Sequence, residues 1–255
     1  MYRSGIIRKT PEQIEQMAAA GAIQARCLKM LAAKCRPGVT TAELDSAAAR
    51  FISSQDAEPS FLGYRGFPGS ICASPNSMVV HGIPDHYELA RGDILSIDVG
   101  VTREGWVADA AVTVPVGPVS EEATHLLEVT KRSLEDAAAQ ARPGNHLGDI
   151  SHAVQARVES EGLSIIRSLV GHGVGRDMHE DPQIPNFGEP GKGPRLEPGM
   201  VLAIEPMVNA GGPEVRVGGD GWAVYSADGS LAAHFEYTVA VTESGPRVLT
   251  PWDQT

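Results

Sequence analysis

The sequence lacks an excess of basic residues, long apolar runs and a regular set of cysteines. Lysine and arginine total 21 against 32 acidic residues, and no basic run follows a phosphate backbone, so we expect no specific nucleic-acid partner. The apolar runs, such as the one around residues 200–204, are far shorter than the roughly 20 residues of a membrane-spanning helix. We therefore expect no membrane partner either.

Cysteine usage and the first residues indicate a compartment. The three cysteines, Cys27, Cys35 and Cys72, are an odd and widely spaced set that fits neither a disulfide framework nor a zinc ribbon. The N-terminal sequence MYRSGIIRKTPEQ has no apolar core of the kind found in signal peptides. Both features predict a cytoplasmic protein.

The chain is long enough for a large hydrophobic core. With 255 residues, of which 42% are hydrophobic, it fits a single catalytic domain over residues 1–255. A chain of this length buries roughly 70 to 75% of its unfolded surface, so neither disulfides nor a structural metal is needed for folding. Any bound metal is therefore expected to serve chemistry.

Helical patterns occur as a pair in each half of the chain. Thr10 is followed by a proline and by Gln13, which is typical of a capping box, and the helical spacing then continues until Pro37. A second helix is predicted to begin at Thr40 or Thr41. Residues 120–140 and 150–158 repeat this two-helix pattern.

The two halves also contain similar sequence segments, which indicates an internal duplication. An offset of 106 superposes residues 36–38 on 142–144, and an offset of 107 superposes strand-like residues 92–98 on 199–205. Chance similarity of alanine-rich helices is the alternative, but it does not account for the strand match. Halves at about 10–115 and 116–250 predict an α+β fold, with antiparallel sheet and helices packed on its outer face. Approximate twofold symmetry would bring Asp98 and Glu205 to equivalent places.

A hairpin is predicted to bring two acidic residues together. Residues 96–101 and 106–112 resemble strands, and a two-residue loop at Arg103 and Glu104 would place Asp98 directly opposite Asp109. A bulge at Gly105 would shift this pairing by one. Two ionised carboxylates about 5 Å apart in a partly buried sheet repel each other unless a cation lies between them. This arrangement favours a divalent metal ion.

Two further acids interrupt apolar strand segments. Glu205 lies in residues 200–207 and Glu236 in residues 234–241, although glutamate is depleted from strands. Each acid alone is more typical of a half-solvated strand, but four such acids favour a shared site. Among the histidines, His172 and His179 lie in a glycine-rich segment and His81 in another short motif, with a buried structural histidine as the alternative.

A glycine-rich loop carries three aromatic residues, although only 5% of the chain is aromatic. Phe61, Tyr64 and Phe67 are predicted to form a pocket wall, with core packing as the alternative. A turn at residues 228–229 is expected to form a hairpin that places Trp222 beside the strand bearing Glu236.

Six motifs together resemble the type I methionine aminopeptidases over residues 14–248. They are VVHGIP, ILSIDVG, WVADAAVT, GHGVGRDMHE, PGMVLAIEPM and HFEYTVAV, in that order. The resemblance implies a pita-bread fold and two divalent metal ions, which are Co, Mn, Fe(II) or Zn. It also implies that the metal ligands are Asp98, Asp109, His172, Glu205 and Glu236.

The resemblance also implies an activity, which is removal of the initiator methionine when the second residue is small. Its substrates would be N-terminal methionine peptides and nascent chains, attacked by a hydroxide that bridges the two metal ions. Glu205 would shuttle a proton, and His81 and His179 would contact the substrate amide and the developing tetrahedral centre. The substrate side chain would be enclosed by Tyr64, Phe67, Cys72, Met178 and Trp222, beside Phe61. Cys72 as an inert buried thiol is the alternative for that residue.

The net charge and the family resemblance together lead to predictions about partners and to rival functions. The acidic charge predicts at most weak and transient ribosome contact, and we expect a monomer. Arg65, Met178, His234 and Tyr237 stand where many relatives have His, Phe, Gln and His. The rivals are an X-Pro aminopeptidase or prolidase on the same fold, and a metal-free binding protein.

Overall fold

The computed structural model describes residues 5–253 and places four α-helices within them. The bounds of α1 are Pro11–Lys34, those of α2 are Thr41–Ser53, those of α3 are Glu121–Ala139, and those of α4 are Leu147–Ser160. Local chemistry determines the first two helix starts, since Thr10 and Thr40 each cap the helix through a reciprocal capping box. The four predicted helices are confirmed, although α4 begins at Leu147 rather than at residue 150.

The strands of the described residues form antiparallel sheets. The first sheet contains β1 (Glu58–Pro59), β4 (Ile94–Arg103) and β2 (Cys72–Pro75), with β5 (Trp106–Pro115) paired to β4. The largest contains β15 (Gly245–Val248), β14 (Tyr237–Thr242), β9 (Val201–Ile204), β7 (Val170–Gly173) and β8 (Glu180–Pro185). Two three-stranded sheets complete the set: β13 (Ala232–His234), β10 (Met207–Asn209) and β6 (Ser164–Ile165), then β11 (Val215–Val217), β12 (Val224–Ser226) and β3 (Met78–Val80).

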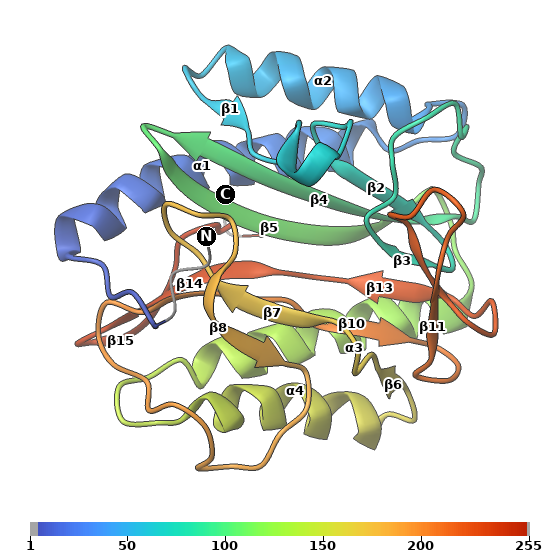
Figure 1. Cartoon of the computed structure of the whole chain (residues 1–255). Helices are drawn as coiled ribbons and strands as arrows, with labels where there is room; N and C mark the ends of the chain where they lie inside the picture. The colour runs from blue at the N-terminus through green and yellow to red at the C-terminus, as the bar shows by residue number, and fades with distance from the viewer. Residues whose placement is uncertain (1–4, 254–255) are drawn as a thin grey trace.

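The helices lie outside the strands, as the sequence predicted. In Figure 1, α1 and α2 cover β4 and β5 from above, and α3 and α4 lie below β10, β13 and β14. The core fills the spaces between these layers with side chains such as Leu28, Leu31, Leu126 and Leu134. Among the described helices, none is long and apolar enough to cross a bilayer. The strands thus form the middle of the molecule, where α1 and α3 shield them on opposite sides.

The two halves are joined by hydrogen bonds between β5 and the segment around β14. The Asp109 N–H donates to Thr238 Oγ1 (3.0 Å), and that hydroxyl donates to the Asp109 carbonyl (2.7 Å). The Glu236 N–H donates to the Ala111 carbonyl (2.9 Å). These bonds bring Asp109 and Glu236 side by side although they are far apart in the sequence.

The predicted register of the β4–β5 hairpin is wrong by two residues. The loop is Glu104 and Gly105 rather than Arg103 and Glu104, so Asp98 lies opposite Ala111 and Asp109 lies opposite Gly100. Both loop residues have positive φ, 52° and 74°, as the primed turns of two-residue hairpins require. Because side chains alternate with a period of two, Asp98 and Asp109 still share one face, as diagonal neighbours.

Glu205 and Glu236 lie at strand ends rather than within continuous strands. The strand β9 ends at Ile204, and β14 begins at Tyr237, so the predicted strands over residues 200–207 and 234–241 are interrupted. Pro206 has no N–H to continue the ladder after Glu205. The register pairs Tyr237 with Ile204, so the two glutamates face each other one step further.

The hairpin predicted around residues 228–229 is also wrong. The strand β12 pairs with β11 and β3, whereas β13 pairs with β10 in another sheet. The side chain of Asp228 accepts hydrogen bonds from the N–H groups of Gly212 and Ser230. The turn therefore joins two strands that belong to different sheets.

Candidate metal centre

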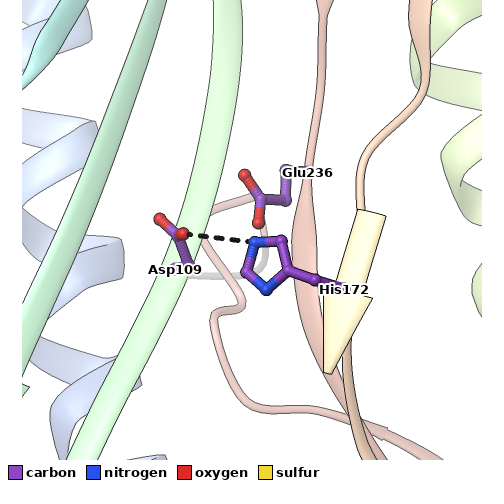
Figure 2. A group of neighbouring side chains, drawn as sticks. All are labelled: Asp109, His172 and Glu236. Carbon is purple, nitrogen blue, oxygen red and sulfur yellow. Dashed lines mark ion pairs between the residues drawn. The ribbon is translucent and has the colours of Figure 1, made fainter. Parts of the chain in front are cut away.

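Three buried side chains from distant segments point toward one another. They are Asp109 on β5, His172 on β7 and Glu236 immediately before β14 (Figure 2). One potential ligand atom of each lies within 4.8 Å of the others. Two carboxylates and an imidazole at these separations form a donor set suited to a divalent transition metal.

The hydrogen bonding of His172 leaves its Nε2 atom without a proton. Nδ1 lies 2.9 Å from the Gly173 carbonyl, which can only accept, so the neutral ring carries its proton on Nδ1. The lone pair on Nε2 then faces Glu205 Oε1 at 3.5 Å and Asp109 Oδ2 at 3.9 Å. Burial lowers the pKa of His172 to about 4, so the ring is not protonated near neutral pH and does not itself supply a positive charge to these carboxylates. The lone pair on His172 Nε2 therefore faces carboxylate oxygens that also carry lone pairs, and a bound cation would remove this repulsion.

The carboxylates show the same need for positive charge. Burial raises the pKa of Asp98, Asp109, Glu205 and Glu236, and the charge of Asp109 raises it further for the other three. Asp98 Oδ1, Asp109 Oδ1 and Glu236 Oε1 are buried without a hydrogen-bond partner. Unpartnered oxygens of this kind are hard ligands, so the residues present fit one or more divalent ions.

A cavity of about 150 Å³ adjoins these ligand atoms and gathers most of the predicted site residues. Its apolar wall contains buried Phe61 and Phe67, and the rings of Phe67 and Trp222 pack in a T-shaped arrangement with their centroids 5.1 Å apart. This cavity is therefore lined both by the candidate metal ligands and by apolar side chains. The full lining is Phe61, Tyr64, Arg65, Phe67, Cys72, His81, Asp98, Asp109, His172, His179, Glu205, Trp222 and Glu236.

Met178 is placed differently from these residues. It is buried and packs in the same apolar cluster as Phe61 and Cys72, and it lines a neighbouring cavity of about 380 Å³. Tyr64 and His179 line both cavities. An extended ligand that filled the smaller cavity would therefore continue past these two rings.

The other two predicted histidines border the cavity in different ways. The Nδ1 atom of His179 lies 2.8 Å from the Tyr64 hydroxyl, and its ring centroid lies 4.2 Å from that of His172. Burial lowers the pKa of His179 to about 3, so this ring is neutral near pH 7. His81 follows β3 with a φ of 62°, a left-handed conformation that is uncommon outside glycine and is found at functional sites. Its side chain remains exposed at the cavity.

A buried ion pair that holds the loop carrying His179 was not predicted from the sequence. Glu180 accepts from the buried ammonium of Lys9 at 2.6 Å and from the Arg176 N–H at 3.0 Å. This ion pair ties the segment before α1 to the loop that carries His179. Its only sequence signal is a lysine just before the capping box, and the distance of 171 residues hides its partner.

His234 has no role among the sequence-based predictions, yet it lies beside the carboxylates. Its Nε2 atom lies 3.7 Å from Glu205 Oε2 and 3.8 Å from Glu236 Oε2. The available signal was its position two residues before Glu236, on the same side of the extended chain. Tyr237 has the opposite orientation, because its hydroxyl donates to Asp253 at 2.6 Å.

Comparisons with known proteins place the chain in a family. The model of metallopeptidase family M24 matches residues 15–243. Methionine aminopeptidase 1 of Bacillus subtilis (strain 168) is 53% identical over 96% of this chain and 99% of its own length. The crystal structure of methionine aminopeptidase from Thermotoga maritima superposes with a TM-score of 0.95 at 45% identity, covering 96% of this chain and 99% of that one.

A more distant structure shares the fold alone. Prolidase from Pyrococcus furiosus superposes with a TM-score of 0.76 at 24% identity, and the match covers 96% of this chain but 65% of the prolidase. The predicted pita-bread fold is confirmed by these structures. With a family model over most of its length and relatives at about half identity, the chain belongs to metallopeptidase family M24, in its methionine aminopeptidase branch.

Proposed function

We propose that this protein is a metal-dependent aminopeptidase that removes an N-terminal methionine when the second residue is small. The observation that carries the proposal is the unprotonated Nε2 of His172, which faces the Glu205 and Asp109 carboxylates beside an apolar cavity. A cation at that point would lie next to a slot lined by aromatic rings and a thiol. The names of the relatives supply the substrate.

Membership of family M24 implies a divalent metal, and the Asp109, His172 and Glu236 group is able to hold one. We propose two ions, because Asp98 and Glu205 add two further, partly buried carboxylates to the same cavity. Oxygen-rich ligation with one imidazole suits Mn, Fe(II) or Co, and Zn is acceptable. Such ions, when bound, supply an activated water near neutral pH and polarise the scissile carbonyl.

The protein's own residues would then bind and orient the peptide. Burial raises the pKa of Glu205, and a carboxyl that takes up a proton more readily suits a proton shuttle to the leaving amine. If the Tyr64 hydroxyl donates to Nδ1 of His179, Nε2 of that ring carries a hydrogen and is free to donate to the substrate. His81, at the exposed side of the cavity, would contact the substrate backbone.

The apolar wall would select the first side chain. Phe61, Phe67, Trp222 and Cys72 form this wall, and a thioether makes favourable contacts with aromatic rings. The second residue would lie beside Tyr64 and His179, where rings from two sides limit its size. Met178 would act from behind this wall, since it packs against the same cluster.

The partners follow from the substrate. Nascent chains and free N-terminal methionine peptides would both enter from the cavity side. With a net charge of −11, contact with ribosomal RNA would be weak and transient. We propose that the protein acts as a monomer.

Peptide turnover after metal reconstitution tests the function. The protein is stripped with a chelator, loaded with Mn²⁺ or Co²⁺, and assayed on Met-Ala-Ser and on an X-Pro peptide. We expect cleavage of Met-Ala-Ser alone, and loss of both bound metal and turnover in Asp109→Ala, whereas Glu122→Ala on the exposed side of α3 matches wild type. Faster cleavage of the X-Pro peptide would favour a prolidase, and inactivity on both would favour a binding protein.

A further inference from the structure

His234 is a buried imidazole beside the candidate metal centre, with no partner of its own. It ends β13, and its side chain is only 2% exposed. Neither ring nitrogen has a hydrogen bond among the residues that the structure describes. A buried polar ring without partners is costly, so a histidine at this position is expected to serve the neighbouring site rather than the core.

The backbone of His234 is held firmly in place. Its N–H donates to Thr113 Oγ1 at 2.9 Å, and its carbonyl accepts from the same hydroxyl at 2.8 Å. It also pairs with Met207 across the sheet. The ring therefore extends from a fixed point, and its direction is set by the fold.

That direction is toward one oxygen of each of two carboxylates. The Nε2 atom lies 3.7 Å from Glu205 Oε2 and 3.8 Å from Glu236 Oε2. The other oxygen of Glu205, Oε1, faces the lone pair of His172 at 3.5 Å. The Glu205 carboxylate thus lies between two imidazoles, with one oxygen turned to the candidate metal and the other to His234.

We propose that His234 is a positioning residue that donates Nε2–H to Oε2 of Glu205 and Oε2 of Glu236 and so orients both carboxylates for metal. A carboxylate oxygen only accepts, so the contact is attractive when Nε2 carries the hydrogen. At 3.7 and 3.8 Å the separations exceed a hydrogen bond, so the proposal requires a rotation of the carboxylates that brings their oxygens within reach of Nε2. Outer-shell partners of this kind orient metal ligands and raise affinity. The proposal rests on the metal binding within the proposed function.

Metal titration of the chelator-stripped protein tests this role without reference to catalysis. Isothermal calorimetry with Mn²⁺ alone is run on wild type, H234Q, H234L and H125L, the last removing an exposed histidine on α3. We expect H234L to raise the dissociation constant about 10- to 100-fold and H234Q, which keeps an N–H donor, to stay within about 3-fold of wild type. H125L should bind as wild type does.

Two outcomes would overturn the proposal. Wild-type affinity in H234L would show that the ring does not orient the carboxylates, and equal weakness of H234Q and H234L would show that His234 coordinates the metal itself. Circular dichroism of the metal-free proteins checks folding, and H234M replaces H234L if the branched side chain does not fit. Absence of Mn²⁺ binding in wild type would instead overturn the metal part of the proposed function.

Discussion

Replacing Glu236 with glutamine should stabilise the metal-free protein while it weakens metal binding. The side chain is 2% exposed, and its Oε1 has no hydrogen-bond partner. Burial, and then the charges of Asp109, Glu205 and Asp98, raise its pKa well above the ordinary 4.5. Because the folded pKa exceeds the unfolded one, the unfolded chain loses this proton first as the pH rises. The folded state therefore loses stability above pH 4.5, and a neutral amide avoids that loss.

The magnitude follows from the proton linkage. Each pH unit between the unfolded pKa and the working pH costs about 1.4 kcal/mol while the folded carboxyl stays protonated. From 4.5 to pH 7.5 the upper bound is about 4 kcal/mol, and at pH 5 it is about 0.7 kcal/mol. We therefore expect Glu236→Gln to raise the free energy of unfolding at pH 7.5, by up to about 4 kcal/mol, and by less than about 1 kcal/mol at pH 5.

Urea unfolding followed by tryptophan fluorescence measures this difference. Wild type, Glu236→Gln and the exposed control Glu15→Gln are compared in a chelator at both pH values. Addition of Mn²⁺ should then reverse the order, because binding stabilises only the protein that retains its ligands. The reasoning is refuted if the metal-free variant is no more stable than wild type at pH 7.5, or if its gain is the same at pH 5.

Three further results are expected. His179→Ala should lower turnover by about 100-fold or more with little change in metal content, and a matching loss of metal by atomic absorption would contradict its role toward substrate. Lys9→Met should lower the free energy of unfolding by about 3 to 5 kcal/mol, because it leaves Glu180 buried without its cation. Adding Glu180→Gln should recover part of this loss, and urea unfolding of both variants is the check. Burial raises the pKa of all three cysteines, so iodoacetamide at pH 7.5 should label them only after unfolding, as mass spectrometry would show.

Local features were predictable because the sequence carries their chemistry directly. The helix starts at Thr10 and Thr40 depend on groups three residues apart, so short-range hydrogen bonds decide them. The metal hypothesis was equally accessible, because ionised acids in apolar strand segments are too costly without a cation. The six motifs then indicated the type I methionine aminopeptidases, and the family model and the relatives agree with that assignment.

Register and strand ends were not predictable from the same information. Two loop pairs were available to the β4–β5 hairpin, and the choice of Glu104 and Gly105 depends on backbone twist at that turn. The strand breaks at Glu205 and Glu236 depend on pairing across the sheet. In both cases the outcome depends on the interaction energies between neighbouring strands. The sequence of a single segment does not reveal these energies.

By itself, the sequence predicted a metal site, because four acids in apolar strand segments are too costly to bury together without a cation, and the family resemblance proposed the ligands. Only the tertiary structure decided how they meet. The Thr238 hydroxyl bonds to the Asp109 backbone across 129 residues, the Gly173 carbonyl fixes the proton of His172, and His234 turns toward two carboxylates. Each of these contacts depends on packing between distant segments, and no local pattern encodes it.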